Sequence, residues 1–171
     1  LGGYWGGRIF SYRHLFCLGM IVQGFGCLLL ATEQHTYLYL ALGAFLTGSG
    51  LNVTCISCML TQRFTAEDTV GRETAFLYNY AGMNLGFFLG YSVSGYFQLQ
   101  QDYAHLFLFS SLGNWIALFI CLYFSKQLVD KETRHSQLTL RKQQQYFVGG
   151  VALITLLPFL LSYFLQFAEF A

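Results

Sequence analysis

The Lys and Arg residues of this chain are confined to three short segments, with long apolar stretches between them. Residues 8–13, 63–72 and 126–142 hold all nine of them. A charged side chain costs about 2.5–3.5 kcal/mol at the centre of a bilayer, so this pattern is typical of a chain that crosses a membrane repeatedly. With 55% of its residues apolar and only 10% charged, the chain could hardly cover a water-soluble surface. We therefore predict an all-α fold, a polytopic membrane helix bundle.

The apolar stretches predict both the spans and their orientation. About 20 helical residues cross a bilayer core, and five stretches are long enough: 14–32, 37–62, 75–97, 104–125 and 146–168. Cationic connections tend to remain in the cytoplasm. We therefore expect 33–36 and 98–103 outside, 63–73 and 126–145 inside, and the N-terminal end of this sequence inside. This predicts a multi-pass protein of a cell membrane, for which we expect the bacterial inner membrane.

The third predicted span has two faces of different character. Gly82, Gly86 and Gly90 recur every four residues, and such a ridge of small residues lets another membrane helix approach closely. Tyr80 and Asn84 lie one turn apart on a different face. That face could line a polar cavity, or Asn84 could make an interhelical hydrogen bond. We predict helix packing for the glycines and substrate binding for Tyr80 and Asn84.

Asn52 is the most polar residue in the middle of the second predicted span. It stands in a segment rich in glycine and hydroxyl residues, which most often serve helix packing. An amide can also hydrogen-bond a solute, because it carries both donors and an acceptor. We therefore include Asn52 among the substrate-binding candidates.

Catalytic and metal chemistry find little support in the sequence. Cys55 and Cys58 form a C-x-x-C pair, but no histidine or second pair stands near them inside the span, so we interpret them as packing residues. No Ser/His/Asp set or phosphate-binding loop falls within the spans. We expect no enzyme activity, no metal, no cofactor and no nucleic-acid partner.

The segment before the first predicted span resembles a conserved loop motif of the major facilitator superfamily. The motif, G-x-x-x-D-R-x-(x)-G-x-R, is matched at Gly3, Arg8 and Arg13, whereas Gly7 replaces its aspartate and Ser11 its second glycine. In that family the motif lies in the loop between helices 2 and 3. The resemblance implies a gating or conformational role for Gly3, Arg8 and Arg13.

Two further stretches are similar to the proton-dependent oligopeptide transporters of that superfamily. Residues 48–51 resemble their G-T-G-L motif on helix 4, and residues 76–86 resemble F-x-x-F-Y-x-x-I-N-x-G on helix 5. The resemblance then runs from the end of helix 2 through helix 7. It implies that residues 1–125 form part of an N-terminal six-helix bundle, 126–145 an interdomain loop, and 146–171 the first helix of a second bundle.

The resemblance implies a secondary transporter that takes up small peptides with protons by alternating access. Tyr80 and Asn84 match the family's tyrosine and asparagine that face the peptide, whereas Val53 stands where many members carry a lysine. A proton-driven carrier needs a titratable group, and none lies well inside a span here. The proton remains the expected coupling ion, and Glu169 is the candidate for an external gate.

Two other functions remain open at this point. A related carrier would move amino acids or another small solute. A non-transporting membrane scaffold would share the apolar spans and packed glycines, but its Tyr80 and Asn84 would not need to face water. In each case we expect the bilayer and the rest of the protein's own chain as partners.

Overall fold

A computed structural model describes residues 2–65, 67–128, 133, 135 and 137–168, and these residues form helices joined by short connections. The helices are α1 (Gly2–Trp5), α2 (Tyr12–Leu30), α3 (His35–Thr61), α4 (Thr69–Leu99), α5 (Tyr103–Tyr123) and α6 (Leu140–Ala168). No strand occurs in the described part of the chain. The all-α prediction is confirmed.

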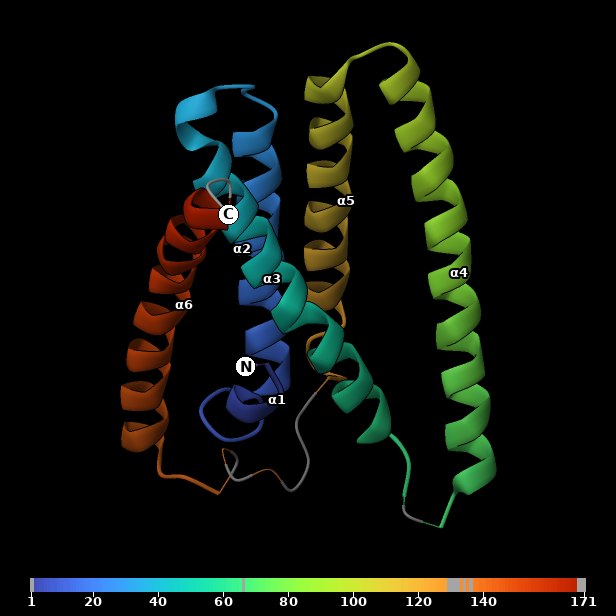
Figure 1. Cartoon of the computed structure of the whole chain (residues 1–171). Coiled ribbons are helices and arrows are strands. Elements are labelled where there is room, and N and C mark those ends of the chain that lie inside the picture. Colours follow the sequence, from blue (N-terminus) through green and yellow to red (C-terminus); the bar gives the residue numbers. More distant parts are fainter. Residues whose placement is uncertain (1, 66, 129–132, 134, 136, 169–171) are drawn as a thin grey trace.

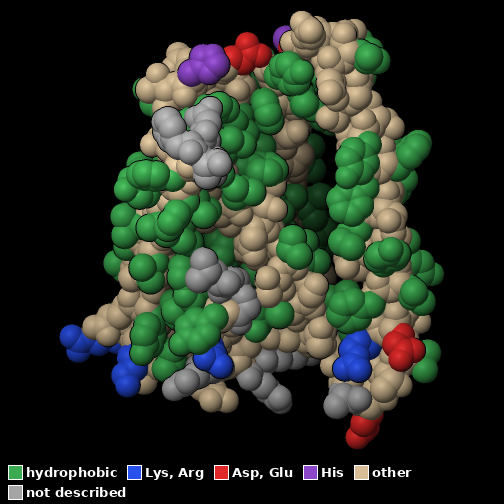
Figure 2. Space-filling model, viewed as in Figure 1, with side chains coloured by type: hydrophobic (Ala, Val, Ile, Leu, Met, Phe, Trp, Pro, Cys, Tyr) green, Lys and Arg blue, Asp and Glu red, His purple; other side chains and the backbone are tan. Residues whose placement is uncertain are grey.

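The long helices run up and down between two ends of the molecule (Figure 1). The α2–α3 and α4–α5 turns lie at one end, and the α3–α4 and α5–α6 connections lie at the other. Figure 2 shows Lys and Arg side chains only near the second end of the face in view. The predicted pairing of connections by side, 33–36 with 98–103 and 63–73 with 126–145, therefore agrees with the fold.

Four of the five predicted spans are confirmed as long and apolar enough to cross a membrane: α2, α3, α5 and α6. Helix α4 has 31 residues, or about 46 Å at 1.5 Å per residue, which exceeds the roughly 30 Å of a bilayer core. Its mean hydropathy is too low for it to count among these four apolar helices. Its glycines, serines, tyrosines and asparagines lower its hydropathy, so the predicted span 75–97 is not confirmed on composition.

Helices α2 and α3 pack closely because glycines leave room for the opposing backbone. A Cβ built on Gly26 would lie 2.8 Å from the backbone nitrogen of Phe45 and 3.0 Å from the carbonyl oxygen of Ala41. A Cβ on Gly48 would lie 2.6 Å from the Cβ of Gln23. Neither position could accept a side chain without moving its neighbour, so these glycines set the distance between the two helices.

Helix α6 meets α3 where proline interrupts its hydrogen bonding. Pro158 lies inside α6, and its backbone lies against Gly43 of α3, where an added Cβ would collide with the Pro158 carbonyl. Proline has no N–H to donate to the carbonyl of Ile154, one turn earlier. Ile154 is only 2% exposed, and it belongs to the same buried core cluster as Leu51 and Cys55 of α3.

The segment before α2 folds back into the bundle. Trp5 and Phe10 are buried, and the Phe10 ring meets Phe147 of α6 edge to face at a centroid distance of 5.6 Å. Gly7 makes the turn with φ of +73°, a conformation that glycine adopts without strain. Its carbonyl accepts a hydrogen bond of 2.8 Å from the backbone N–H of His135, which fastens the 126–145 connection to this turn.

Side chains satisfy both ends of α5. At its start the Asp102 carboxylate accepts hydrogen bonds from the backbone N–H and the imidazole of His105, at 3.2 and 2.8 Å. The imidazole hydrogen bond, followed by the backbone one, lowers the pKa of Asp102 below its ordinary value. At its end the Arg13 guanidinium of α2 donates a 2.7 Å hydrogen bond to the carbonyl of Ser125. The positive charge of Arg13 also interacts favourably with the negative end of the α5 dipole.

Candidate functional site

A groove of about 780 Å³ separates α4 from α3, and we call it the α3–α4 groove. Its lining side chains come from both helices: Val53, Ile56, Ser57, Arg72, Glu73, Phe76, Leu77, Asn79, Tyr80 and Met83. Its volume lies in the range of 300–1,000 Å³ that is usual for small-molecule sites.

The groove combines apolar walls with a few polar groups. Val53, Ile56, Phe76, Leu77 and Met83 give it apolar surface on both sides. Such walls with a small number of polar side chains suit a small amphipathic solute, because the apolar area supplies affinity and the polar groups fix orientation.

Both signs of charge meet at one end of the groove. Arg72 and Glu73 lie in the first turn and a half of α4, after Asp68, whose carboxylate caps the helix by accepting a 2.9 Å hydrogen bond from the N–H of Gly71. The groove therefore offers one charge of each sign at this end. Sequence inspection missed both residues, since they stand in a segment interpreted only as a cationic connection.

Tyr80 and Asn84 have different surroundings on α4. Tyr80 is 62% exposed and lines the groove, as its predicted role requires. Asn84 is exposed too, but its side-chain amide donates a 2.9 Å hydrogen bond to the carbonyl of Tyr80 within the same helix. Asn84 is not one of the side chains that form the groove wall.

Asn52 lies elsewhere, in the interface between α2 and α3. It is 4% exposed, and its amide donates to Gln23 Oε1 at 2.8 Å and approaches Met20 Sδ at 3.5 Å. Its Oδ1 is buried against Gly19 and has no hydrogen-bond partner among the described residues. The structure therefore does not bring Asn52 together with Tyr80 in the α3–α4 groove.

The described residues place no helix against the α4 glycine ridge, so the predicted helix packing of Gly82, Gly86 and Gly90 stays a prediction. A Cβ added to Gly82, Gly86 or Gly90 would meet nothing within 4 Å. All of α4 is described, and none of its residues is buried. The ridge permits a close approach but faces no helix among the residues that the structure describes.

The three motif residues near the N-terminus have different environments. Gly3 is in α1, and Arg8 is exposed with its guanidinium 4.8 Å from the centre of the Tyr4 ring. Arg13 is the residue that joins α2 to the end of α5. Glu169, the candidate gate, lies outside the described residues.

Fold and groove together define a polytopic helical membrane protein with a solute-sized site between two helices. The family model of the Major Facilitator Superfamily matches residues 1–171, and the chain belongs to this superfamily.

Curated relatives are similar to the chain over most of its length. It is 26% identical over 166 residues to the dipeptide and tripeptide permease A of Serratia proteamaculans, covering 94% of this chain and 32% of that protein. It is 27% identical over 120 residues to the permease of that name from Chromobacterium violaceum, covering 69% and 24%. With dipeptide and tripeptide permease B of Aliivibrio fischeri the identity is 28% over 127 residues, covering 73% and 25%.

The chain spans about a quarter to a third of the length of these relatives. No solved structure matches it significantly.

Proposed function

We propose that this chain forms part of a transporter for small peptides that works by alternating access, with the proton as coupling ion. One observation carries the proposal: Tyr80, the residue that sequence resemblance assigns to the peptide, lines a solute-sized groove. The names of the similar permeases support the same substrate class.

The chemistry of the groove suits a short peptide. A peptide carries an ammonium at one end and a carboxylate at the other, and Glu73 and Arg72 offer the complementary charges. Its side chains would meet the apolar walls formed by Phe76, Leu77 and Met83. The Tyr80 hydroxyl can donate to or accept from the peptide's own amide groups.

The depth of Tyr80 agrees with a central transport site. It lies 11 residues from the start of α4 at Thr69, or about 16 Å along the helix. Carriers commonly hold their substrates near the bilayer midplane. We place the Lys and Arg end of the molecule in the cytoplasm, in a bacterial inner membrane, following the positive-inside rule.

The domain arrangement belongs to the same proposal. Residues 126–145 would connect an N-terminal bundle to a second bundle that begins with α6, and the two would rock around the groove. Anchoring of this connection through His135 and Gly7 would couple it to the motif that holds Arg8 and Arg13. Glu169 remains a candidate for the external gate.

Uptake of a labelled dipeptide by cells that produce the intact protein tests the assignment of Tyr80. Tyr80→Phe removes one hydroxyl from the groove and should weaken apparent affinity roughly tenfold, the worth of one well-placed hydrogen bond. Tyr78→Phe is the matched control, because Tyr78 is also exposed on α4 but does not form the groove wall. Asn84→Ala should reduce uptake less, since the Asn84 amide is bonded within α4.

The outcomes separate the proposed function from its alternatives. Equal uptake by Tyr80→Phe and Tyr78→Phe at the same membrane abundance would remove Tyr80 from the substrate site. Transport of an amino acid but not a dipeptide would identify another small solute as substrate. A protein that inserts normally and moves none of these compounds would support a scaffold.

A further inference from the structure

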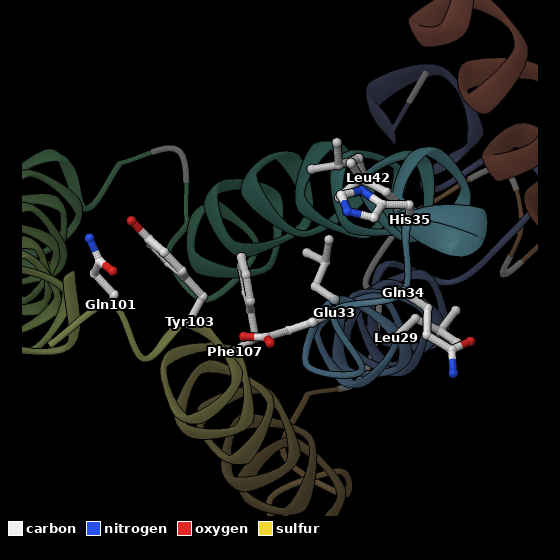
Figure 3. A pocket seen from close by; sticks show the side chains of 10 residues that line it. Leu29, Glu33, Gln34, His35, Leu42, Gln101, Tyr103 and Phe107 are labelled. Atoms are coloured by element: carbon white, nitrogen blue, oxygen red, sulfur yellow. The ribbon is translucent and has the colours of Figure 1, made fainter.

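A second cavity, of about 640 Å³, lies at the end of the molecule opposite the Lys and Arg residues. We call it the outer pocket. It is formed where the α2–α3 turn approaches the α4–α5 turn, and Figure 3 shows its side chains between α2, α3 and α5. Its inner surface is apolar, with Leu30, Leu38 and Phe107 among the lining residues.

The backbone at the rim of the outer pocket is unusual in two places. Glu33 has φ of +53° and Gln101 has φ of +55°, and they are the two non-glycine residues with positive φ in the described part of the chain. Both line the outer pocket, although 68 positions separate them in the sequence. The left-handed region disfavours residues that carry a Cβ.

Helix termination explains the conformation of these two residues but not their side chains. After α4 the N–H of Asp102 donates to the carbonyl of Phe97 at 3.0 Å, which is the hydrogen bond of a Schellman motif with Gln101 in the left-handed position. Glycine serves that position best. In the left-handed conformation the α2–α3 turn carries Glu33 and the α4–α5 turn carries Gln101 instead, and both residues line the outer pocket.

The electrostatics of the outer pocket favour a cation. Glu33 supplies the pocket's carboxylate, and the described residues that line it include His35 but no Lys or Arg. In Figure 3 the Glu33 side chain extends from the α2–α3 turn toward Phe107, whereas the Tyr103 ring points the other way, toward Gln101. Asp102, at the start of α5, does not line the pocket, and its carboxylate is paired with His105 at 2.8 Å.

We propose that the outer pocket binds a small organic ammonium ion that carries an apolar group. Glu33 would serve as counter-ion of the ammonium, and Gln101 and Tyr103, on the other side of the pocket, would contact the rest of the ligand. The leucines and Phe107 would enclose the apolar group. The outer pocket is separate from the α3–α4 groove, so this binding does not depend on transport.

Phenylalanine amide is a suitable probe, because it combines an ammonium with an aromatic group and lacks a carboxylate. Calorimetric titration of the intact protein in detergent should show saturable binding, whereas N-acetylphenylalanine amide, without the ammonium, should not bind. Glu33→Gln should weaken binding of phenylalanine amide about tenfold, equivalent to about 1.4 kcal/mol. Asp102→Asn is the matched control and should leave affinity unchanged, since Asp102 does not line the pocket.

Glu33→Gly separates a ligand role from a role in the turn. Glycine relieves the left-handed backbone, so the melting temperature of this variant should stay level or rise while binding is lost. Parental affinity in both Glu33 variants, or no saturable binding by the parental protein, would overturn the proposal. Binding that is lost in Tyr80→Phe but kept in the Glu33 variants would place the probe in the α3–α4 groove, and this result would also overturn the proposal.

Discussion

Helices α2 and α4 both carry several glycines, yet the α2 glycines pack against other helices and the α4 ridge of Gly82, Gly86 and Gly90 does not. A Cβ on Gly26 would lie 2.8 Å from the α3 backbone, whereas a Cβ on Gly86 would meet nothing within 4 Å. Both helices therefore permit a close approach, but within the described part of the chain only the α2 glycines have a helix packed against them. A stripe of small residues allows helix contact, and the complementary surface on another helix decides whether contact occurs.

The asparagines of the two regions show the same contrast. The Asn52 amide crosses from α3 to Gln23 of α2, while the Asn84 amide stays on its own helix and bonds the carbonyl of Tyr80. A buried amide in lipid must find a partner, because no water is there to replace it. An exposed amide beside a groove can satisfy itself locally and remains available to exchange that bond for a solute.

The largest expected effect compares alanine at a packed and an unpacked glycine. Gly48→Ala would put a methyl group 2.7 Å from the backbone nitrogen of Gln23, so the helices must separate, at a cost of about 1–3 kcal/mol. Gly86→Ala meets nothing and should stabilise α4 slightly, since alanine is the better helix former by roughly 0.5–1 kcal/mol. Thermal unfolding in detergent, followed by size-exclusion fluorescence, measures both.

The Gly48→Ala and Gly86→Ala variants together test whether the glycines of the two regions differ in packing. If Gly86→Ala destabilised the intact protein as much as Gly48→Ala, the α4 ridge would be packed against a surface outside the described residues. The original prediction of a packed ridge would then hold for the assembled protein.

Much of the fold follows from charge and hydropathy. The positions of Lys and Arg locate the connections, and the predicted span 104–125 differs from α5 (Tyr103–Tyr123) by no more than two residues at either end. Helix α6 begins at Leu140, six residues before the predicted 146, because its first turns are polar yet still helical. Hydropathy marks the part of a helix in lipid, not its full length.

Partners of individual side chains are harder to predict from the sequence. The polarity of Asn52 singles it out, but nothing in its own segment shows that Gln23, 29 positions earlier, would face it. The outer pocket was missed for a similar reason, because Glu33 and Gln101 belong to turns far apart in the chain. A long polar residue two or three positions after a helix end, where glycine is usual, is the signal that could have drawn attention to both.

A smaller effect should measure the hydrogen bond between Asn52 and Gln23. Interhelical hydrogen bonds in membranes average about 0.6 kcal/mol and reach about 1.7 kcal/mol, so a double-mutant cycle of Asn52→Ala and Gln23→Ala should give a coupling energy in this range. Unfolding in mixed micelles of increasing denaturing detergent gives the free energies. Asn84→Ala is the matched control on α4 and should change stability less, because its hydrogen bond does not cross between helices. Additive effects of the two α2–α3 substitutions would show that the 2.8 Å contact contributes nothing.

The smallest effect concerns Asp102, which starts α5 at the turn from the unpacked helix α4 to the packed bundle. The hydrogen bonds from His105 hold its pKa below the ordinary 3.8, so the folded protein favours the carboxylate. A depressed pKa contributes stability above the ordinary value, and that contribution is lost as pH falls through the pKa of the folded state. Asp102→Asn should therefore lower the melting temperature slightly at about pH 6 and make progressively less difference below about pH 4. A difference between parent and variant that stays constant over this range would mean that the carboxylate's charge adds nothing to an ordinary helix cap, and that the turn between the two regions is held by its backbone hydrogen bonds alone.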